Sequence, residues 1–183
     1  MLPVTPPMHL ALSLAGQPGA ATPAECTAIA QHAGLHGLAC VLLGSPAGDM
    51  VTLLGGLVAP TLGVGLGARL DVDHTEPFHT ARAFAVLDNL SSGRTAWWLN
   101  LRPPVAGNGR YGHRPVLDTS AHYARAEEYI HVVLRLWDSW EHDAVVVDKA
   151  AGLFADARKI HPIHHRGVHF QVRGPLTAVR EQG

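Results

Sequence analysis

Short apolar runs alternate with longer, partly polar segments along the first hundred residues of the chain. Each apolar run is bounded by turn-forming residues and is typical of a buried strand, whereas the segments between the runs have helical length. The runs predict strands at 8–14, 38–44, 61–70 and 94–101, and the intervening segments predict helices at 22–34, 49–60 and 76–93. Because strand and helix alternate with short connections, the pattern predicts right-handed βαβ units on a parallel sheet and an α/β fold.

Capping residues mark the expected ends of these helices. Thr22 precedes Pro23, and proline is favoured at the first position of a helix. Asp49 offers a side-chain oxygen to the first turn of the second helix. Pro77 opens the third helix, and Gly93 follows its end.

A loop rich in proline and glycine, 102–120, precedes the most strongly amphipathic segment, 121–140. Apolar residues recur there at three- and four-residue spacing and predict one buried stripe. The stripe consists of Tyr123, Ala126, Ile130, Val133, Leu134, Trp137 and Trp140. Asp118 and the two residues after it offer caps, and Glu127 and Glu128 are expected to face away from the stripe or to lie at its edge.

The segment after this helix shows no sustained period, and 141–183 is predicted to be irregular. Only 167–174 alternates well enough for an edge strand or one arm of a hairpin. Four histidines lie close together here: His161, His164, His165 and His169. Such a density raises a divalent-metal site as one interpretation. Their spacing matches no common metal site, so an exposed hairpin that carries histidines is favoured instead.

Composition and charge exclude several classes of function. The 183 residues are 47% hydrophobic and 16% charged, which suits one domain, with βα units at 8–140 and a hairpin-bearing excursion at 141–183. The net charge of -1 provides no basic field for nucleic acid. No run approaches the roughly 18 apolar residues of a membrane span. Cys26 and Cys40 have no metal-type spacing, and a reduced, cytoplasmic compartment is expected.

Functional residues are expected where the predicted strands end. In parallel βα folds, ligands bind at the carboxyl ends of the strands, which selects 44–45, 68–73 and 100–102. Trp98 lies within reach of that face, where an aromatic ring lines a ligand pocket or fills it. The glycine-rich stretch 61–70 lacks the full phosphate-loop motif, so its glycines are expected to let a strand pack closely.

Three segments together resemble one protein family. EPFHTARAFAVLDNLSSGR, from Glu76, resembles a stretch EPYxLARxFASLDxLSxGR, and KIHPIHHRGVHFQVRGPL, which ends at Leu176, resembles an element HxGxHFxVRGPL. Between them, YARAEEYIHVVLRLWDSWEHDAVVVDKAAGLFAD resembles the long helix of the same family and the excursion that follows it. The family is that of the luciferase-like flavin-dependent monooxygenases, in the branch of nitrilotriacetate monooxygenase, pristinamycin IIA synthase and dibenzothiophene-sulfone monooxygenase.

The resemblance implies a (β/α)8 TIM barrel and an oxidoreductase. Such a barrel usually takes about 250 residues, so the chain is expected to hold about four βα units, the N-terminal half. The family implies reduced FMN that a separate flavin reductase supplies, activation of O₂, and oxygen insertion into a small organic substrate. It also implies that the histidine-bearing hairpin is not a metal site.

The resemblance assigns the flavin-facing positions to six residues and leaves the catalytic residues unknown. The six are Ser45, Arg69, Trp98, Asn100, Thr119 and Tyr123. Ser45 stands where the family commonly has Asp, Trp98 where it has Asn, and Thr119 where it often has His. Leu101 replaces a Thr. Tyr123 is kept, and as a residue of the predicted stripe it has an equally good interpretation as a core tyrosine.

Two hypotheses of different classes follow. The first is an FMN-dependent monooxygenase family member with a diverged flavin site and without the C-terminal half barrel. The second is a non-catalytic subunit or remnant that pairs with itself or with a full-length monooxygenase, because a half barrel leaves its outer strands open. A truncated gene product without present function is not separated from the second by the sequence.

Overall fold

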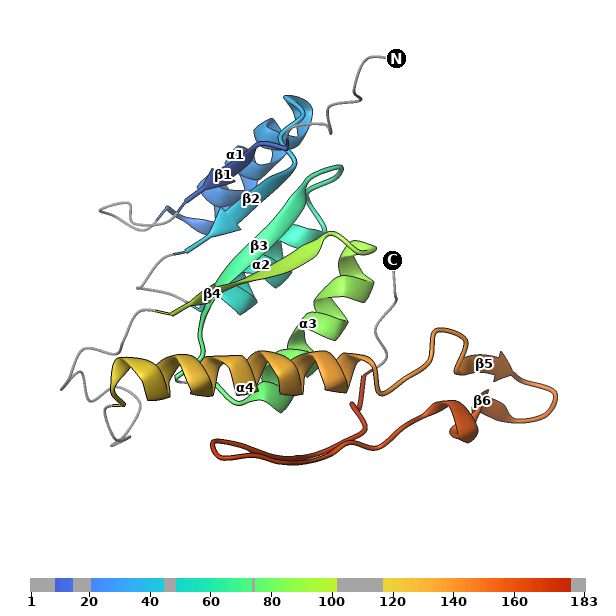
Figure 1. The fold of residues 1–183 in the computed structure, drawn as a ribbon. Coiled ribbons are helices and arrows are strands. Elements are labelled where there is room, and N and C mark those ends of the chain that lie inside the picture. The colour runs from blue at the N-terminus through green and yellow to red at the C-terminus, as the bar shows by residue number, and fades with distance from the viewer. Residues whose placement is uncertain (1–8, 15–20, 45–48, 74, 102–116, 179–183) are drawn as a thin grey trace, which may run out of the picture. The chain divides into compact units, whose positions relative to one another are not determined.

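The computed structural model of the chain contains two compact units. It describes residues 9–14, 21–44, 49–73, 75–101 and 117–178. Unit 1 comprises Met1–Arg69 and Arg94–Trp98, and unit 2 comprises Leu70–Gly93 and Leu99–Gly183. Figure 1 colours the chain from blue at the N-terminus to red at the C-terminus.

Unit 1 is built from alternating strands and helices. Its elements are β1 (Ala11–Ser13), α1 (Pro23–Leu35), β2 (Cys40–Leu43), α2 (Met50–Val58) and the greater parts of β3 (Gly65–Asp71) and β4 (Thr95–Asn100). β1 pairs with β2 and β2 with β3 in parallel, and the strand order is β1-β2-β3-β4 (Figure 1). The alternation and the parallel sheet that the sequence predicts are therefore confirmed.

Local chemistry fixes the helix starts of unit 1. Thr22 and Glu25 form a reciprocal capping box, in which the Glu25 amide donates to the Thr22 hydroxyl at 3.3 Å and the Thr22 amide donates to the Glu25 carboxylate at 2.7 Å. Asp49 accepts hydrogen bonds from the amides of Val51 and Thr52 at 3.0 and 3.1 Å. Both predicted caps are confirmed. The core of the unit is apolar and includes Val41, Leu43, Leu54, Leu57, Leu66 and Ala68, all at most 1% exposed.

Unit 2 combines a helix pair with two hairpins. Its elements are α3 (Pro77–Ser91), α4 (Thr119–Trp137), β5 (Val145–Asp148), β6 (Leu153–Ala155), the 3-10 turn η1 (Ala157–Lys159), β7 (His164–Arg166) and β8 (Gln171–Arg173). α3 packs against α4, where the Trp137 indole donates to the Ala81 carbonyl at 2.9 Å. The β7–β8 hairpin runs along α4, whereas β5 and β6 lie beyond its C-terminal end (Figure 1). Tyr129, Val132, Val133 and Leu136 of α4 form the centre of the core.

The buried face of α4 differs from the predicted stripe. Tyr123 and Leu134 are 52% and 46% exposed, so the stripe is wrong at these positions. His122 and Arg125 are buried instead, because Val72 and Asp73 provide polar partners for Arg125 and a carboxylate beside His122. A pattern of apolar positions does not reveal such a polar contact. The helix also ends at Trp137, so Trp140, expected on the helix, lies beyond it.

The segment after α4 is more regular than the sequence predicts. β5 pairs antiparallel with β6, with an irregularity between Val145 and Asp148, so the prediction of an irregular segment is wrong there. β7 pairs antiparallel with β8, which confirms the predicted hairpin arm.

Most of the predicted loop, 102–116, lies outside the described residues, and the single domain stays a prediction. Among the helices that the structure describes, none has the length and apolar character needed to cross a membrane.

Candidate functional site

The six residues expected to face the flavin divide between the two units. Arg69 and Trp98 belong to unit 1, whereas Asn100, Thr119 and Tyr123 belong to unit 2. Ser45 lies outside the described residues. The unit-2 members are therefore the ones whose mutual geometry the structure gives.

In unit 1, the two expected residues lie on β3 and β4. Arg69 is half-buried on β3 and follows Ala68, which is fully buried. Trp98 is 40% exposed on β4. An aromatic ring with this exposure leaves a large apolar surface available for a ligand or for another chain.

In unit 2, the ends of β3 and β4 are tied together by polar side chains. Asp71 is the last residue of β3 and Asn100 is the last residue of β4. The Asn100 side-chain amide donates a hydrogen bond to the Asp71 carboxylate. This bond uses one donor of Asn100 and leaves its carbonyl oxygen available as an acceptor.

The first turns of α4 present two hydroxyl groups. Asp118 caps the helix by accepting a hydrogen bond from the Ala121 amide at 2.8 Å, which confirms the expected cap. Thr119 and Tyr123 are four residues apart, so they lie on one face of the helix, and both are exposed. The alternative interpretation of Tyr123 as a core tyrosine is therefore wrong.

A buried polar cluster in these turns is absent from the sequence-based prediction. His122 is completely buried, and its Nδ1 lies 3.3 Å from the Asp73 carboxylate. Arg125 is 3.7 Å from the same oxygen and donates to the Val72 carbonyl at 2.7 Å. The available signal was the spacing of His122 and Arg125, which are three residues apart on one helix face.

Tyr129 forms a second buried polar site one turn further along α4. Its hydroxyl hydrogen-bonds with the hydroxyls of Thr75 at 2.7 Å and Thr80 at 2.5 Å. Burial raises the pKa of the Tyr129 hydroxyl, and the two threonine hydrogen bonds offset this only in part. The Phe170 ring packs edge-on against Tyr129 with the ring centroids 5.6 Å apart.

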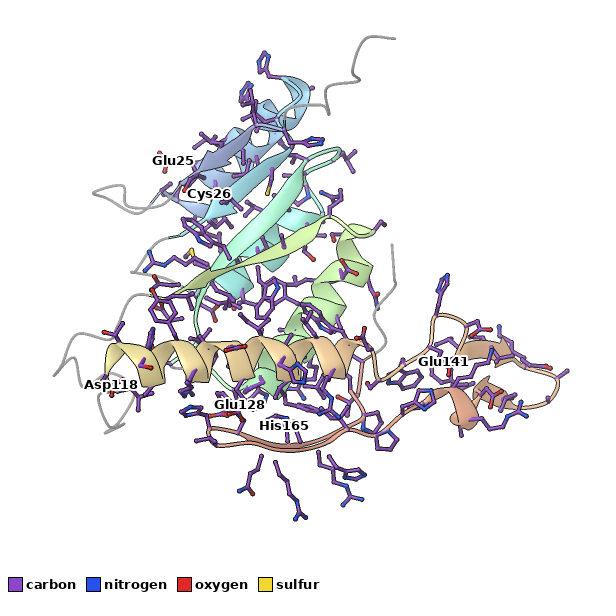
Figure 2. The ribbon with its side chains drawn as sticks, in the orientation of Figure 1. Glu25, Cys26, Asp118, Glu128, Glu141 and His165 are labelled. Atoms are coloured by element: carbon purple, nitrogen blue, oxygen red, sulfur yellow. The ribbon has the colours of Figure 1, made fainter. Side chains whose placement is uncertain are left out.

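Glu128 holds the β7–β8 hairpin against α4. Its carboxylate accepts hydrogen bonds from the amides of His169 at 3.0 Å and Phe170 at 2.9 Å, and it bonds with the His165 ring at 2.8 Å (Figure 2). Burial acts to raise the pKa of Glu128, but the hydrogen bonds from His165 and the two amides outweigh it and lower the pKa below its ordinary value. Glu128 is thus a structural anchor at the edge of the helix.

Two of the four clustered histidines form separate pairs with carboxylates. His165 pairs with Glu128, and His161 pairs with Glu141 at 2.7 Å, near β5 and β6 (Figure 2). In the part of the chain that the structure describes, no three His, Cys, Asp or Glu side chains form a group that could hold a metal ion.

Comparison with known proteins supplies the family. A profile of the family "Luciferase-like monooxygenase" matches residues 5–183. Dibenzothiophene-sulfone monooxygenase of Rhodococcus erythropolis is 42% identical over 80% of this chain and 31% of its own. Component A of nitrilotriacetate monooxygenase from Aminobacter aminovorans is 41% identical over 70% of this chain and 28% of its own.

A solved structure matches the fold over nearly the whole chain. The riboflavin lyase RcaE, with modified FMN and its substrate riboflavin, has a TM-score of 0.85 and 25% identity over 95% of this chain and 48% of its own. The chain thus spans about a third of the length of the two curated relatives and about half of this structure. The chain belongs to the luciferase-like monooxygenase family, and its βα units correspond to part of that family's TIM barrel.

Proposed function

We propose that the chain provides βα units of a monooxygenase that uses reduced FMN, delivered by a separate flavin reductase, to oxidise a small organic substrate. The observation that carries the proposal is the 42% identity to a monooxygenase over 80% of the chain. The free cysteines Cys26 and Cys40, whose thiol pKa values burial raises, suit the reduced conditions of the cytoplasm.

The unit-2 side chains fit the polar edge of a flavin in their chemistry. The isoalloxazine edge consists of amide-like donors and acceptors, and Asn100, Thr119 and Tyr123 offer an uncharged amide and two hydroxyls. Thr119 and Tyr123 are exposed, so a ligand can reach their hydroxyls without displacing other parts of the protein. When bound, reduced FMN would supply the electrons that activate O₂.

In this proposal, residues of the chain would bind the flavin and orient it. Asp71 holds the Asn100 side chain through one amide proton, so that the Asn100 carbonyl keeps a fixed direction. Asp118 caps the start of α4, whose first two turns carry the hydroxyls of Thr119 and Tyr123. In unit 1, Arg69 offers a positive charge and Trp98 an apolar ring that would exclude water. Ser45 remains a proposed flavin contact on the resemblance alone.

A flavin titration tests the proposal. The 183-residue chain should quench FMN fluorescence with saturation, and the double variant Thr119→Ala, Tyr123→Phe should weaken binding about tenfold, as expected for two lost hydrogen bonds. Thr177→Ala, at an exposed position near the C-terminus, is the matched control and should bind as the unchanged chain does. Failure of the chain to bind FMN in either redox state would contradict the proposal.

A second function is favoured by the edges of the sheet. β1 and β4 are the outer strands in the described part of the chain, and Ala11 of β1 is exposed. An outer strand of a sheet is a site for pairing with another chain. The chain would then be a non-catalytic subunit that pairs with itself or with a full-length monooxygenase. Light scattering after size exclusion tests the self-pairing form, because a stable monomer of 19.5 kDa would contradict it.

A further inference from the structure

Among the described residues, one fully buried side chain of unit 2 lacks the partners that buried polar groups have. His122, in the first turns of α4, is 0% exposed. Among the described residues, neither of its ring nitrogens has a hydrogen-bond partner. The great majority of buried polar side-chain atoms are hydrogen-bonded, so a ring with two unbonded nitrogens needs an explanation other than stability.

A carboxylate lies beside this ring. The Asp73 side chain is 14% exposed and follows the end of β3, and its Oδ1 is 3.3 Å from His122 Nδ1. The nitrogen and oxygen are close enough that a small rotation of the imidazole would form an Nδ1–H to carboxylate hydrogen bond. Asp73 is thus the residue that can select the tautomer of His122. A carboxylate accepts a hydrogen bond from a protonated ring nitrogen and repels the lone pair of an unprotonated one.

Arg125 approaches the same oxygen of the carboxylate. Its Nη1 is 3.7 Å from Asp73 Oδ1 and donates to the Val72 carbonyl at 2.7 Å. Its guanidinium also lies over the Phe170 ring, 4.5 Å from the centroid. The Val72 carbonyl and the Phe170 ring thus hold Arg125 in place, and Arg125 balances the charge of Asp73, so the imidazole is not required as a counter-charge.

The imidazole touches the exposed face of α4 through Tyr123. The two rings are edge-on, with centroids 6.0 Å apart and an interplanar angle of 74°. Tyr123 and Thr119 form the hydroxyl-bearing face described above, whereas His122 and Arg125 form the buried face of the same turns. The exposed Tyr123 ring therefore packs against the imidazole of His122, and the Asp73 carboxylate can set the orientation of that imidazole.

We propose that Asp73 and His122 are a positioning pair for the flavin-binding face of unit 2. Asp73 holds the imidazole through Nδ1–H, and the imidazole holds the Tyr123 ring in the orientation that meets the flavin. The inference rests on the proposed function. It explains why a histidine occupies a site that an apolar ring of similar size would fill without burying polar nitrogens.

Replacing the histidine by phenylalanine separates positioning from packing. His122→Phe keeps an aromatic ring and removes both nitrogens, so the melting temperature should stay the same or rise. FMN binding should weaken about fivefold or more. The phenyl ring lacks the Nδ1–H group through which Asp73 orients the imidazole, and with it the Tyr123 ring. His131→Phe, at an exposed position of the same helix, is the control and should leave FMN binding unchanged. Unchanged FMN binding by His122→Phe would overturn the proposal.

A second measurement needs no flavin. The ¹⁵N shifts of the His122 ring report which nitrogen carries the proton, and the expected tautomer is Nδ1–H in the unchanged chain. Asp73→Asn should shift the population toward Nε2–H, whereas Asp143→Asn, in the segment that precedes β5, should leave it unchanged. An Nε2–H tautomer in the unchanged chain refutes the pair, and this holds even if Asp73→Asn fails to fold. If the unchanged chain binds no FMN, the proposed function and the link to flavin both fail, while the tautomer still decides the pair.

Discussion

The carboxylate of Glu128 occupies the space that a side chain on residue 167 would need. A Cβ built on Gly167 would collide with the Glu128 carboxylate and would lie 2.6 Å from His165 Nε2. The Gly167 amide meanwhile donates to the Phe170 carbonyl at 2.9 Å, which closes the turn of the hairpin. Glycine at this position therefore lets α4 and the β7–β8 hairpin approach closely enough to share three hydrogen bonds with Glu128.

Gly167→Ala should loosen the hairpin from α4. The added methyl group must displace the Glu128 carboxylate, and overpacking of this kind costs about 1–3 kcal/mol. Chemical denaturation should show a lower free energy of unfolding, and amide exchange at His169 and Phe170 should accelerate because both amides donate to Glu128. Gly56→Ala is the control: nothing lies within 4 Å of its added Cβ, and alanine in a helix should raise stability by about 0.5–1 kcal/mol. Equal stability of Gly167→Ala and the unchanged chain would contradict the close approach.

Glu128 should also make the stability of unit 2 depend on pH in the acidic range. Its hydrogen bonds lower the pKa of the folded state below the ordinary value, so its contribution is complete above about pH 4.3 and is lost as the pH falls through the lowered pKa. Glu128→Gln keeps the shape but removes the charge-assisted bonds to two amides and to His165. The variant should be less stable at pH 7, and the difference from the unchanged chain should shrink toward pH 3. A difference that stays constant over this range would show that the carboxylate charge is not involved.

Tyr129→Phe should destabilise unit 2 and abolish an alkaline transition. The substitution leaves the Thr75 and Thr80 hydroxyls without their shared partner, a loss of about 1–2 kcal/mol. Burial raises the pKa of Tyr129, so its contribution to stability is complete below the ordinary value near 10 and is lost as the pH rises through the raised pKa. The unchanged chain should therefore lose stability above pH 10 more steeply than Tyr129→Phe does. Tyr123→Phe, at a 52% exposed position, should melt as the unchanged chain does.

The sequence predicts those features of the fold that depend on local pattern. Thr22 and Asp49 mark helix starts because capping depends on the side chain and on the next three residues. The buried face of α4 depends instead on groups distant in sequence: Arg125 is buried because the Val72 carbonyl and the Asp73 carboxylate meet it there. Propensity and periodicity contain no information on such partners.

The β5–β6 hairpin shows a second limit of sequence patterns. Val147 has φ of 50°, a left-handed conformation that a β-branched residue rarely adopts, and it lies within the irregular part of β5. No rule based on residue type would place a turn-like backbone at this valine.

The candidate site can likewise be predicted only in part from sequence patterns. Asn100 and Tyr123 are placed at a strand end and a helix start as the pattern predicts, whereas the cluster of Asp73 and His122 depends on tertiary contacts.

Trp98→Asn tests whether the bulky indole ring limits flavin binding. Trp98 is 40% exposed on β4, so the substitution should change the free energy of unfolding by no more than about 0.5 kcal/mol. The FMN dissociation constant should change by less than about threefold, because Ser45 and Leu101 still differ from the polar residues that the family has at these positions. Trp98→Phe, which keeps an aromatic ring, provides the comparison, and both variants are measured by quenching of FMN fluorescence. Binding that tightens tenfold or more in Trp98→Asn, but not in Trp98→Phe, would instead identify the indole ring as the group that blocks the cofactor.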